Sequence, residues 1–145
     1  MSYARTNARQ SAVQALYQWQ MTGQNLNEIE EQFYLDEHFK NVHRGYFKEL
    51  LHGIPHQLTQ LDQALSEFAD RRVNEIDPVE RAILRIGVYE LLNRPDVPYK
   101  VIVNEGINLA KRYGATESHK YVNSILDKVA HKRRPDEAGD GKTKP

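Results

Sequence analysis

Apolar residues recur every three to four positions along most of the chain, which is the spacing of one face of an α-helix. No segment sustains the alternation of apolar and polar residues that is typical of a half-buried strand. We therefore predict an all-α protein with about seven helices. The pattern places them at about residues 4–20, 27–34, 46–54, 58–68, 78–92, 99–113 and 118–129.

The segment that begins at Asp77 carries the strongest signals of a helix start and of burial. Asp77 can cap the helix, Pro78 suits its first turn, and Glu80 can close a capping box. Apolar residues then occupy almost every side of the helix as far as Leu92. A helix that is apolar all round is buried, so we predict that this one forms the centre of the fold.

The C-terminal part of the chain ends in a charged tail. Gly114 is predicted as the left-handed residue that ends one helix, and Thr116 or Ser118 as the N-cap of the last helix. Residues 135–145 are rich in Gly, Pro and charged residues, and we predict that they are disordered. The sequence thus predicts one helical domain over residues 1–134 and a tail over residues 135–145.

Composition excludes several classes of protein. Of the 145 residues, 39% are hydrophobic and 28% are charged, which is enough apolar material for a folded core. The absence of cysteine excludes a disulfide framework, a zinc ribbon, an iron–sulfur cluster and a thiol nucleophile. No apolar run approaches the ~20 residues that span a bilayer, and the first residues lack the apolar stretch of a secretory signal. We therefore expect a cytoplasmic protein that does not bind membranes.

Charge is unevenly distributed along a chain whose net charge is zero. Residues 1–24 carry two arginines and no acid, residues 25–80 are acidic, and residues 81–145 are basic again. If the two basic ends meet in the folded protein, one face becomes positive and can attract a polyanion such as RNA. The alternative, which charge alone favours, is an ordinary solvated surface.

Motifs of common enzymes are missing from the sequence. It contains no Gly-x-Gly-x-x-Gly, no P-loop and no Gly-x-Ser-x-Gly. Glu49, His52 and His56 have the spacing of a metal-binding helical face, but Pro55 between the histidines disturbs that geometry. The acidic residues between positions 28 and 37 have no apolar setting, so we interpret them as solvated surface or as a contact for a basic partner. We expect no catalytic residue, no bound metal and no cofactor.

Basic and aromatic residues combine at both ends of the chain. Arg5 and Arg9 are one helical turn apart and extend the first helix beyond its apolar face. Near the other end of the chain, Tyr113 is the last residue of one predicted helix. Glu117, Lys120 and Tyr121 form a mixed cluster at the start of the next. An aromatic side chain among cations can stack an unpaired RNA base while the cations bind phosphates. The equally weighted alternative is that both tyrosines are aromatic residues at the edge of the core.

Five segments follow one another in the order and spacing of a known family. They are residues 12–20 (AVQALYQWQ), 79–91 (VERAILRIGVYEL), 96–101 (DVPYKV), 114–123 (GATESHKYVN) and 126–130 (LDKVA). Together they strongly resemble the NusB family of bacterial transcription antitermination factors over about residues 3–131.

The resemblance implies a fold of two small helical bundles packed along the first helix. It also implies binding of the boxA element of nascent ribosomal RNA transcripts together with NusE, a small-subunit ribosomal protein, in a complex with NusA, NusG and RNA polymerase. The RNA-binding face of the family corresponds to Arg5, Arg9, Tyr113, Glu117, Lys120 and Tyr121. Its NusE face corresponds to Glu80, Arg85 and Tyr17. We therefore predict that the two ends of the chain fold side by side.

The sequence departs from the family at positions that bear on function. Thr6 and Asn7 interrupt the run of arginines with which family members often begin, so we expect weaker RNA binding and a shallower salt dependence. Gly106 stands where the family often has Ala, which is expected to loosen the helix before the RNA-binding turn. Some family members form homodimers that cover this face, and the sequence leaves a homodimer open.

Two alternatives to an RNA-binding adaptor remain open. One is a helical protein-interaction module that binds itself or NusE and binds RNA only weakly. The other is enzymatic, because a similar helical domain precedes the catalytic domain of some ribosomal RNA cytosine methyltransferases. No nucleotide-binding βαβ pattern follows in this sequence, so we expect no enzymatic activity.

Overall fold

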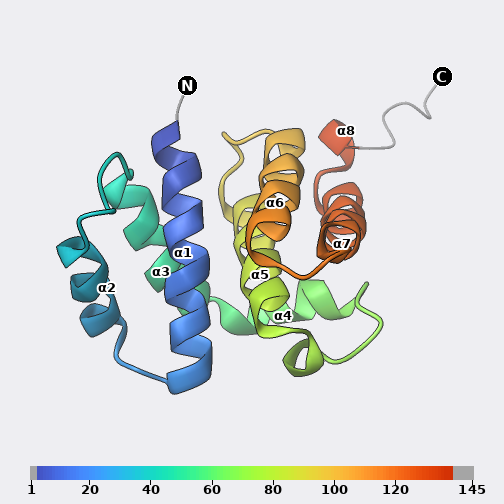
Figure 1. Ribbon diagram of the computed structural model, residues 1–145. Coiled ribbons are helices and arrows are strands. Elements are labelled where there is room, and N and C mark those ends of the chain that lie inside the picture. The colour runs from blue at the N-terminus through green and yellow to red at the C-terminus, as the bar shows by residue number, and fades with distance from the viewer. Residues whose placement is uncertain (1–2, 139–145) are drawn as a thin grey trace. The chain divides into compact units, whose positions relative to one another are not determined.

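The computed structural model describes residues 3–138, which form helices joined by short turns (Figure 1). The helices are α1 (Tyr3–Thr22), α2 (Leu26–Leu35), α3 (Arg44–His56), α4 (Leu58–Ser66), the 3₁₀ turn η1 (Val73–Glu75), α5 (Pro78–Asn93), α6 (Tyr99–Tyr113), α7 (Ser118–Arg133) and α8 (Pro135–Ala138). No strand occurs within residues 3–138. The prediction of an all-α protein is therefore confirmed.

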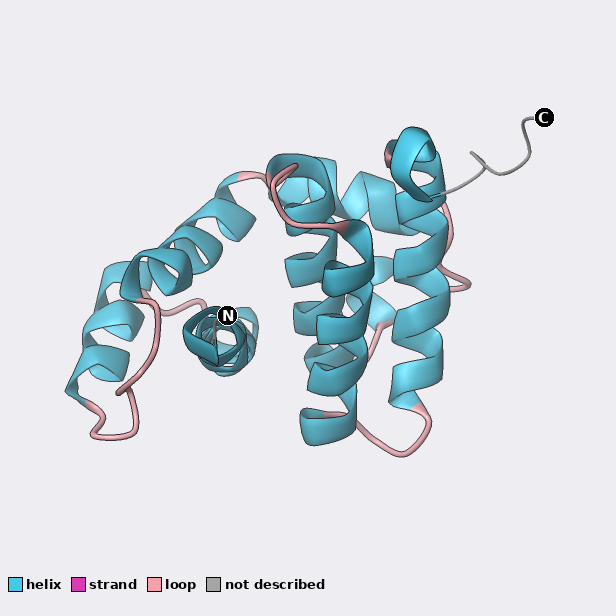
Figure 2. Cartoon of the chain, turned by 90° about the horizontal axis from the view of Figure 1, so that it is seen from above, coloured by secondary structure: helices cyan, strands magenta, loops and turns pink. Residues whose placement is uncertain are grey.

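The chain divides into two compact units, Met1–Leu58 and Thr59–Pro145. In the first unit α1 packs against α3 and α2, and Figure 2 shows α1 nearly end-on beside these two helices. Its core contains Ile29 and the apolar face of α3, and the Phe47 ring meets the rings of Phe33, Tyr34 and Phe39.

In the second unit α5, α6 and α7 pack against one another. Almost all of α5 is buried, as its apolar circumference predicted. Leu126 of α7 lies against Gly87 of α5 and Gly106 of α6, where an added methyl group would come within 2.7 Å of it. Gly106 therefore permits a close approach between helices, which differs from the expectation that it loosens α6.

The start of α5 agrees with the sequence prediction except at Glu80. Asp77 accepts hydrogen bonds from the backbone N–H groups of Val79 and Glu80, and Pro78 occupies the first turn. The Glu80 carboxylate does not close a capping box, because it accepts a hydrogen bond from the Ser118 hydroxyl instead.

The turn between α6 and α7 differs from the prediction. Gly114 has φ −90° and ψ 173°, which is extended backbone, whereas Glu117 has a φ of 78° and lies in the left-handed region. Glu117 precedes α7 without a side-chain capping bond, so neither Thr116 nor Ser118 is the N-cap. Gly114 is needed for space, since a Cβ there would lie 2.7 Å from Ser118 Oγ and 2.9 Å from the Ala110 carbonyl oxygen.

The predicted tail begins with a short helix rather than with disorder. Arg134 donates hydrogen bonds to the carbonyl oxygens of Glu90, Leu91, Arg94 and Val97, and Glu137 accepts one from the Tyr99 backbone N–H. These non-local bonds hold α8 against the rest of the second unit, and a local compositional pattern does not reveal them. The rest of the predicted tail, residues 139–145, lies outside the described residues.

Candidate nucleic-acid interface

The basic end of α1 lies against an aromatic ring of the first unit. The guanidinium carbons of Arg5 and Arg9 lie 4.6 and 5.4 Å from the centre of the Tyr46 ring, a geometry that supports cation–π attraction. Arg9 is only 3% exposed, whereas Arg5 is partly exposed. Of the two predicted arginines, Arg5 is thus the more accessible to a phosphate.

Asn7, one of the residues that interrupt the arginine run, has a structural contact. Its side-chain amide donates a hydrogen bond of 3.0 Å to the Asn41 carbonyl oxygen, and the His43 N–H donates one of 3.0 Å to the Ala4 carbonyl oxygen. These bonds fix the loop between α2 and α3 against the first turn of α1. Asn7 therefore has a structural role, since it holds this loop in place.

In the second unit Tyr121 is held by the loop that follows α4. Its hydroxyl donates a hydrogen bond of 3.2 Å to Asp70 Oδ1, and the Arg71 guanidinium carbon lies 4.7 Å from the ring centre. Partial burial and the bond to Asp70 raise the pKa of the Tyr121 phenol above its ordinary value, against the opposite effect of Arg71. The phenol is therefore neutral at physiological pH, and its ring is oriented by two residues of another segment.

Asp70 and Arg71 were missed by sequence reasoning. Arg71 also donates two hydrogen bonds to Asp70, of 2.8 and 3.1 Å. Hydrogen bonding to Arg71 is the largest of the effects that lower the pKa of Asp70. The only local signal was the adjacent pair of arginines at positions 71 and 72. The proximity of Asp70 and Arg71 to Tyr121, which is about fifty residues away in the chain, depends on tertiary packing.

Glu117 and Lys120 form an exposed ion pair at the start of α7. Lys120 Nζ lies 2.7 Å from Glu117 Oε1, and the two side chains are 71% and 61% exposed. Exposed pairs of this kind are weak, so a phosphate can compete with Glu117 for Lys120. Tyr113, at the end of α6, accepts a hydrogen bond of 3.2 Å from Arg112 Nε.

The predicted RNA-binding residues divide between the two units. Arg5 and Arg9 belong to the first unit, while Tyr113, Glu117, Lys120 and Tyr121 gather in the second unit around the turn between α6 and α7. Each unit is defined by itself, so the expectation that the two ends of the chain lie side by side stays a prediction.

His52, one of the three residues with the spacing of a metal-binding helical face, contacts a carboxylate of another helix. His52 Nε2 lies 2.7 Å from Glu30 Oε1, and Tyr34 donates a 2.5 Å hydrogen bond to Glu30 Oε2. Glu30 is buried, so the interpretation of the acidic segment as solvated surface is wrong at this position. No cluster of potential metal ligands occurs within the described part of the chain, and none of its helices is long and apolar enough to cross a membrane.

Comparison with known proteins decides the family, because residues 6–131 match the NusB family model. The chain belongs to the NusB family. It is 56% identical over 133 residues to transcription antitermination protein NusB of Pseudomonas savastanoi pv. phaseolicola, covering 92% of this chain and 81% of that protein. It is 52% identical over 137 residues to the same-named protein of Nitrosococcus oceani, covering 94% and 92%. The resemblance inferred from the five segments is thereby confirmed.

Solved structures of NusB proteins have the same fold. A T. maritima NusB is 31% identical and superposes with a TM-score of 0.80 over 100% of both chains. A structure of the antitermination factors NusB and NusE in complex with dsRNA matches at 25% identity with a TM-score of 0.74, covering 89% of this chain and 97% of that one.

The three residues carried over to the NusE face of the NusB family differ in accessibility. Tyr17 on α1 is 40% exposed. Glu80 is partly exposed and bonded to Ser118. Arg85 is only 7% exposed, and its guanidinium makes two hydrogen bonds to Asp62, of 3.0 and 2.8 Å. Burial and pairing favour a structural role for Arg85, and its assignment to the NusE face stays a prediction.

Proposed function

We propose that this chain is a non-enzymatic transcription antitermination factor that binds boxA RNA of nascent ribosomal transcripts together with NusE. In this function it joins NusA, NusG and RNA polymerase in the cytoplasm and supports elongation past terminators. Membership of the NusB family supports this proposal, and so does the relative that is described with NusE and RNA. A protein that acts as an adaptor in this way needs no cofactor.

The observation that carries the proposal is the environment of Tyr121. Its ring is partly exposed, neutral and oriented by Asp70 and Arg71, and the preceding residue in the chain, Lys120, is exposed. Stacking of an unpaired base on an aromatic ring beside cations is the common mode of single-stranded RNA recognition. We therefore assign base stacking to Tyr121 and phosphate binding to Arg71 and Lys120.

The first unit contributes phosphate binding by Arg5, with Arg9 in support. Each phosphate that a cation neutralises contributes about 0.7 to the slope of log affinity against log salt for a single strand. Replacing both arginines by Ala should therefore make this slope shallower, with its magnitude reduced by up to about 1.4. Because Arg9 is buried, we expect most of this change from the Arg5→Ala single variant.

The proposal is tested by titrating labelled boxA RNA with the protein at several salt concentrations, with and without NusE. We expect specific binding that NusE tightens and that salt weakens. The matched control is Lys100→Ala, which removes an exposed lysine from the first turn of α6 and should leave the slope unchanged. A protein that binds boxA no better than a scrambled RNA, even with NusE, would contradict the proposal.

A second candidate function is a protein-interaction module with weak RNA binding. The observation that favours it is the low exposure of Arg9 together with the use of Asn7 to hold a loop. This candidate predicts tight NusE binding or self-association together with an RNA affinity that does not respond to Arg5→Ala. Analytical ultracentrifugation alongside the same titrations separates the two.

A further inference from the structure

The outer face of α7 continues beyond Tyr121 into a second aromatic and basic site. Helical spacing places Lys128 and Lys132 on the same side of the helix as Tyr121. Because a helix rises 1.5 Å per residue, Lys128 lies about 10 Å further along the axis than Tyr121. A single strand that leaves Tyr121 along α7 therefore reaches Lys128 next.

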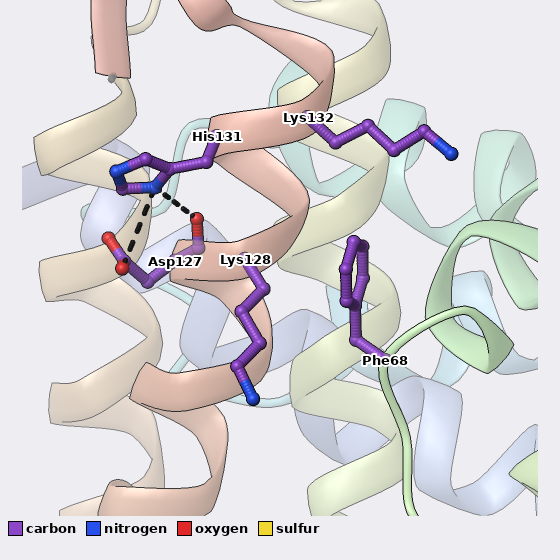
Figure 3. Close-up of a pocket in the computed structure, with 5 residues that line it drawn as sticks. All are labelled: Phe68, Asp127, Lys128, His131 and Lys132. Atoms are coloured by element: carbon purple, nitrogen blue, oxygen red, sulfur yellow. Dashed lines mark hydrogen bonds and ion pairs between the residues drawn. The ribbon is translucent and has the colours of Figure 1, made fainter. Parts of the chain in front are cut away.

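The loop that follows α4 runs beside this face and contacts it at both ends. Near its start Glu67 pairs with Lys132 at 2.9 Å, and further along Asp70 and Arg71 hold Tyr121. Phe68 lies between these contacts along the chain. It lines an open pocket together with Asp127, Lys128, His131 and Lys132. In Figure 3 the Phe68 ring stands between the side chains of Lys128 and Lys132.

The charges in this pocket favour an anion at Lys128. Lys128 is exposed and makes no ion pair with any residue between 3 and 138, whereas Lys132 is paired with Glu67. His131 Nδ1 lies 2.8 Å from the Asp127 carbonyl oxygen and 3.6 Å from its carboxylate, so the acid is turned toward the histidine. Figure 3 shows this pair on the other side of Lys128 from Phe68.

We propose that this pocket is a second RNA subsite, in which Phe68 stacks a base adjoining the boxA segment and Lys128 binds a neighbouring phosphate. An aromatic ring beside an unpaired lysine suits a nucleotide better than an acidic peptide, because only the nucleotide uses both the ring and the cation. The inference rests on the proposed function, since it requires that the boxA segment is bound at Tyr121.

The test compares boxA RNA with boxA RNA that carries a short run of uridines at its 5′ or its 3′ end. For the wild-type protein we expect one of the two extensions to tighten binding about five- to hundredfold, which is the range for one stacked base. Phe68→Leu keeps an apolar side chain and should abolish this gain while leaving the affinity for unextended boxA unchanged. Thermal unfolding of each variant verifies that it is folded.

Two further arms separate stacking from phosphate binding. An abasic extension should lose the part of the gain that depends on Phe68 and keep the part that depends on Lys128. Lys128→Gln should reduce the magnitude of the salt slope by about 0.7 for the extended RNA only. The exposed control Lys100→Gln should leave the slope unchanged for both RNAs.

The possible failures are distinguishable. If unextended boxA does not bind, the proposed function fails and the subsite is rejected with it. If boxA binds but neither extension adds affinity, or if the gain persists in Phe68→Leu and Lys128→Gln, the subsite alone is overturned. If the extension adds no affinity and an acidic peptide displaces the RNA, the subsite is also overturned, and the pocket is assigned to a protein partner.

Discussion

The Arg71 guanidinium lies over the ring of Tyr121, 4.7 Å from its centre, although the two residues belong to different segments of the second unit. The same tyrosine donates a hydrogen bond to Asp70, which Arg71 also binds. A cation, a carboxylate and a ring thus fix one another. This arrangement favours one orientation of the aromatic side chain before any ligand arrives, which lowers the entropy lost on binding.

Two substitutions of Tyr121 should therefore differ in effect. Tyr121→Phe keeps the ring and its contact with Arg71 and loses only an exposed hydrogen bond, so boxA affinity should stay within about twofold. Tyr121→Ala removes the stacking surface and should weaken binding about five- to hundredfold. Fluorescence anisotropy with labelled RNA measures both, and equal losses for the two variants would mean that the hydroxyl rather than the ring contacts the RNA.

Glu117→Gln should strengthen RNA binding. The amide removes a negative charge from the start of α7 and releases Lys120, whose 2.7 Å ion pair with Glu117 competes with a phosphate. The expected gain is about two- to fivefold, which is the range of an exposed ion pair. In a Lys120→Gln background the gain should shrink. Weaker binding by Glu117→Gln would show instead that the carboxylate accepts a hydrogen bond from a base.

The sequence predicted features that depend on local pattern and failed where distant segments decide. The start of α5 after Asp77 follows from the capping side chain of that residue, and the burial of α5 follows from its apolar circumference. Both signals are visible in the local sequence. The contacts of Tyr121 with Asp70 and of Arg85 with Asp62 join segments that only tertiary packing brings together. Hence Tyr121 was found from its neighbours in the chain, whereas Asp70 and Arg71 were not.

The turn before α7 illustrates a second limit. Glycine is the usual left-handed residue at a helix end, so Gly114 was the reasonable prediction. The structure uses Gly114 for its small size against Ser118 and Ala110, and Glu117 takes the positive φ. Steric demand from a neighbouring side chain has no signature in the local sequence.

Arg85→Lys should destabilise the second unit without affecting NusE binding. The buried guanidinium makes a two-point contact with Asp62 that an ammonium group cannot reproduce. We expect a loss of about 1.5–3 kcal/mol in the free energy of unfolding, measured with urea, and a NusE affinity within about twofold of wild type for the folded protein. A loss of NusE affinity at unchanged stability would place Arg85 on the partner face.

The buried carboxylate of Glu30 should make the first unit sensitive to acid. Burial raises the pKa of Glu30, but hydrogen bonds from Tyr34 and His52, together with electrostatic attraction from His52 and Lys48, outweigh it and lower the pKa below its ordinary value of 4.5. A carboxylate whose pKa is lowered by folding stabilises the folded state above pH 4.5, and this contribution is lost as the pH falls through the folded pKa.

Glu30→Gln should accordingly lower the free energy of unfolding at pH 7 by about 1–3 kcal/mol, because its NH₂ group cannot accept the hydrogen bond that one partner donates. The difference from wild type should shrink below pH 4.5. Denaturant unfolding across this pH range measures it. The control is Glu31→Gln, the exposed neighbour on α2, and an equal effect of both substitutions at every pH would remove the special role of Glu30.

Leu126 contacts two glycines. We therefore predict that the effect of Gly106→Ala on the free energy of unfolding changes sign when Leu126 is replaced by Ala. An added methyl group at Gly106 would lie 2.7 Å from Leu126 Cδ1 and 3.2 Å from Val122 Cγ1. Gly106→Ala therefore gains about 1 kcal/mol of helix propensity and loses about 1–3 kcal/mol through overpacking, so we expect net destabilisation.

In the Leu126→Ala background, which itself should cost about 2–5 kcal/mol, the obstructing side chain is gone. Gly106→Ala should then stabilise α6 by about 1 kcal/mol. Urea unfolding of the four proteins in the cycle measures the coupling. Gly45→Ala, whose new methyl group would make only an ordinary 3.5 Å contact with the His43 ring, should have the same effect in both backgrounds. If Gly106→Ala behaves like this control, Leu126 yields to the methyl group, and Gly106 is not required for the approach of α6 to α7.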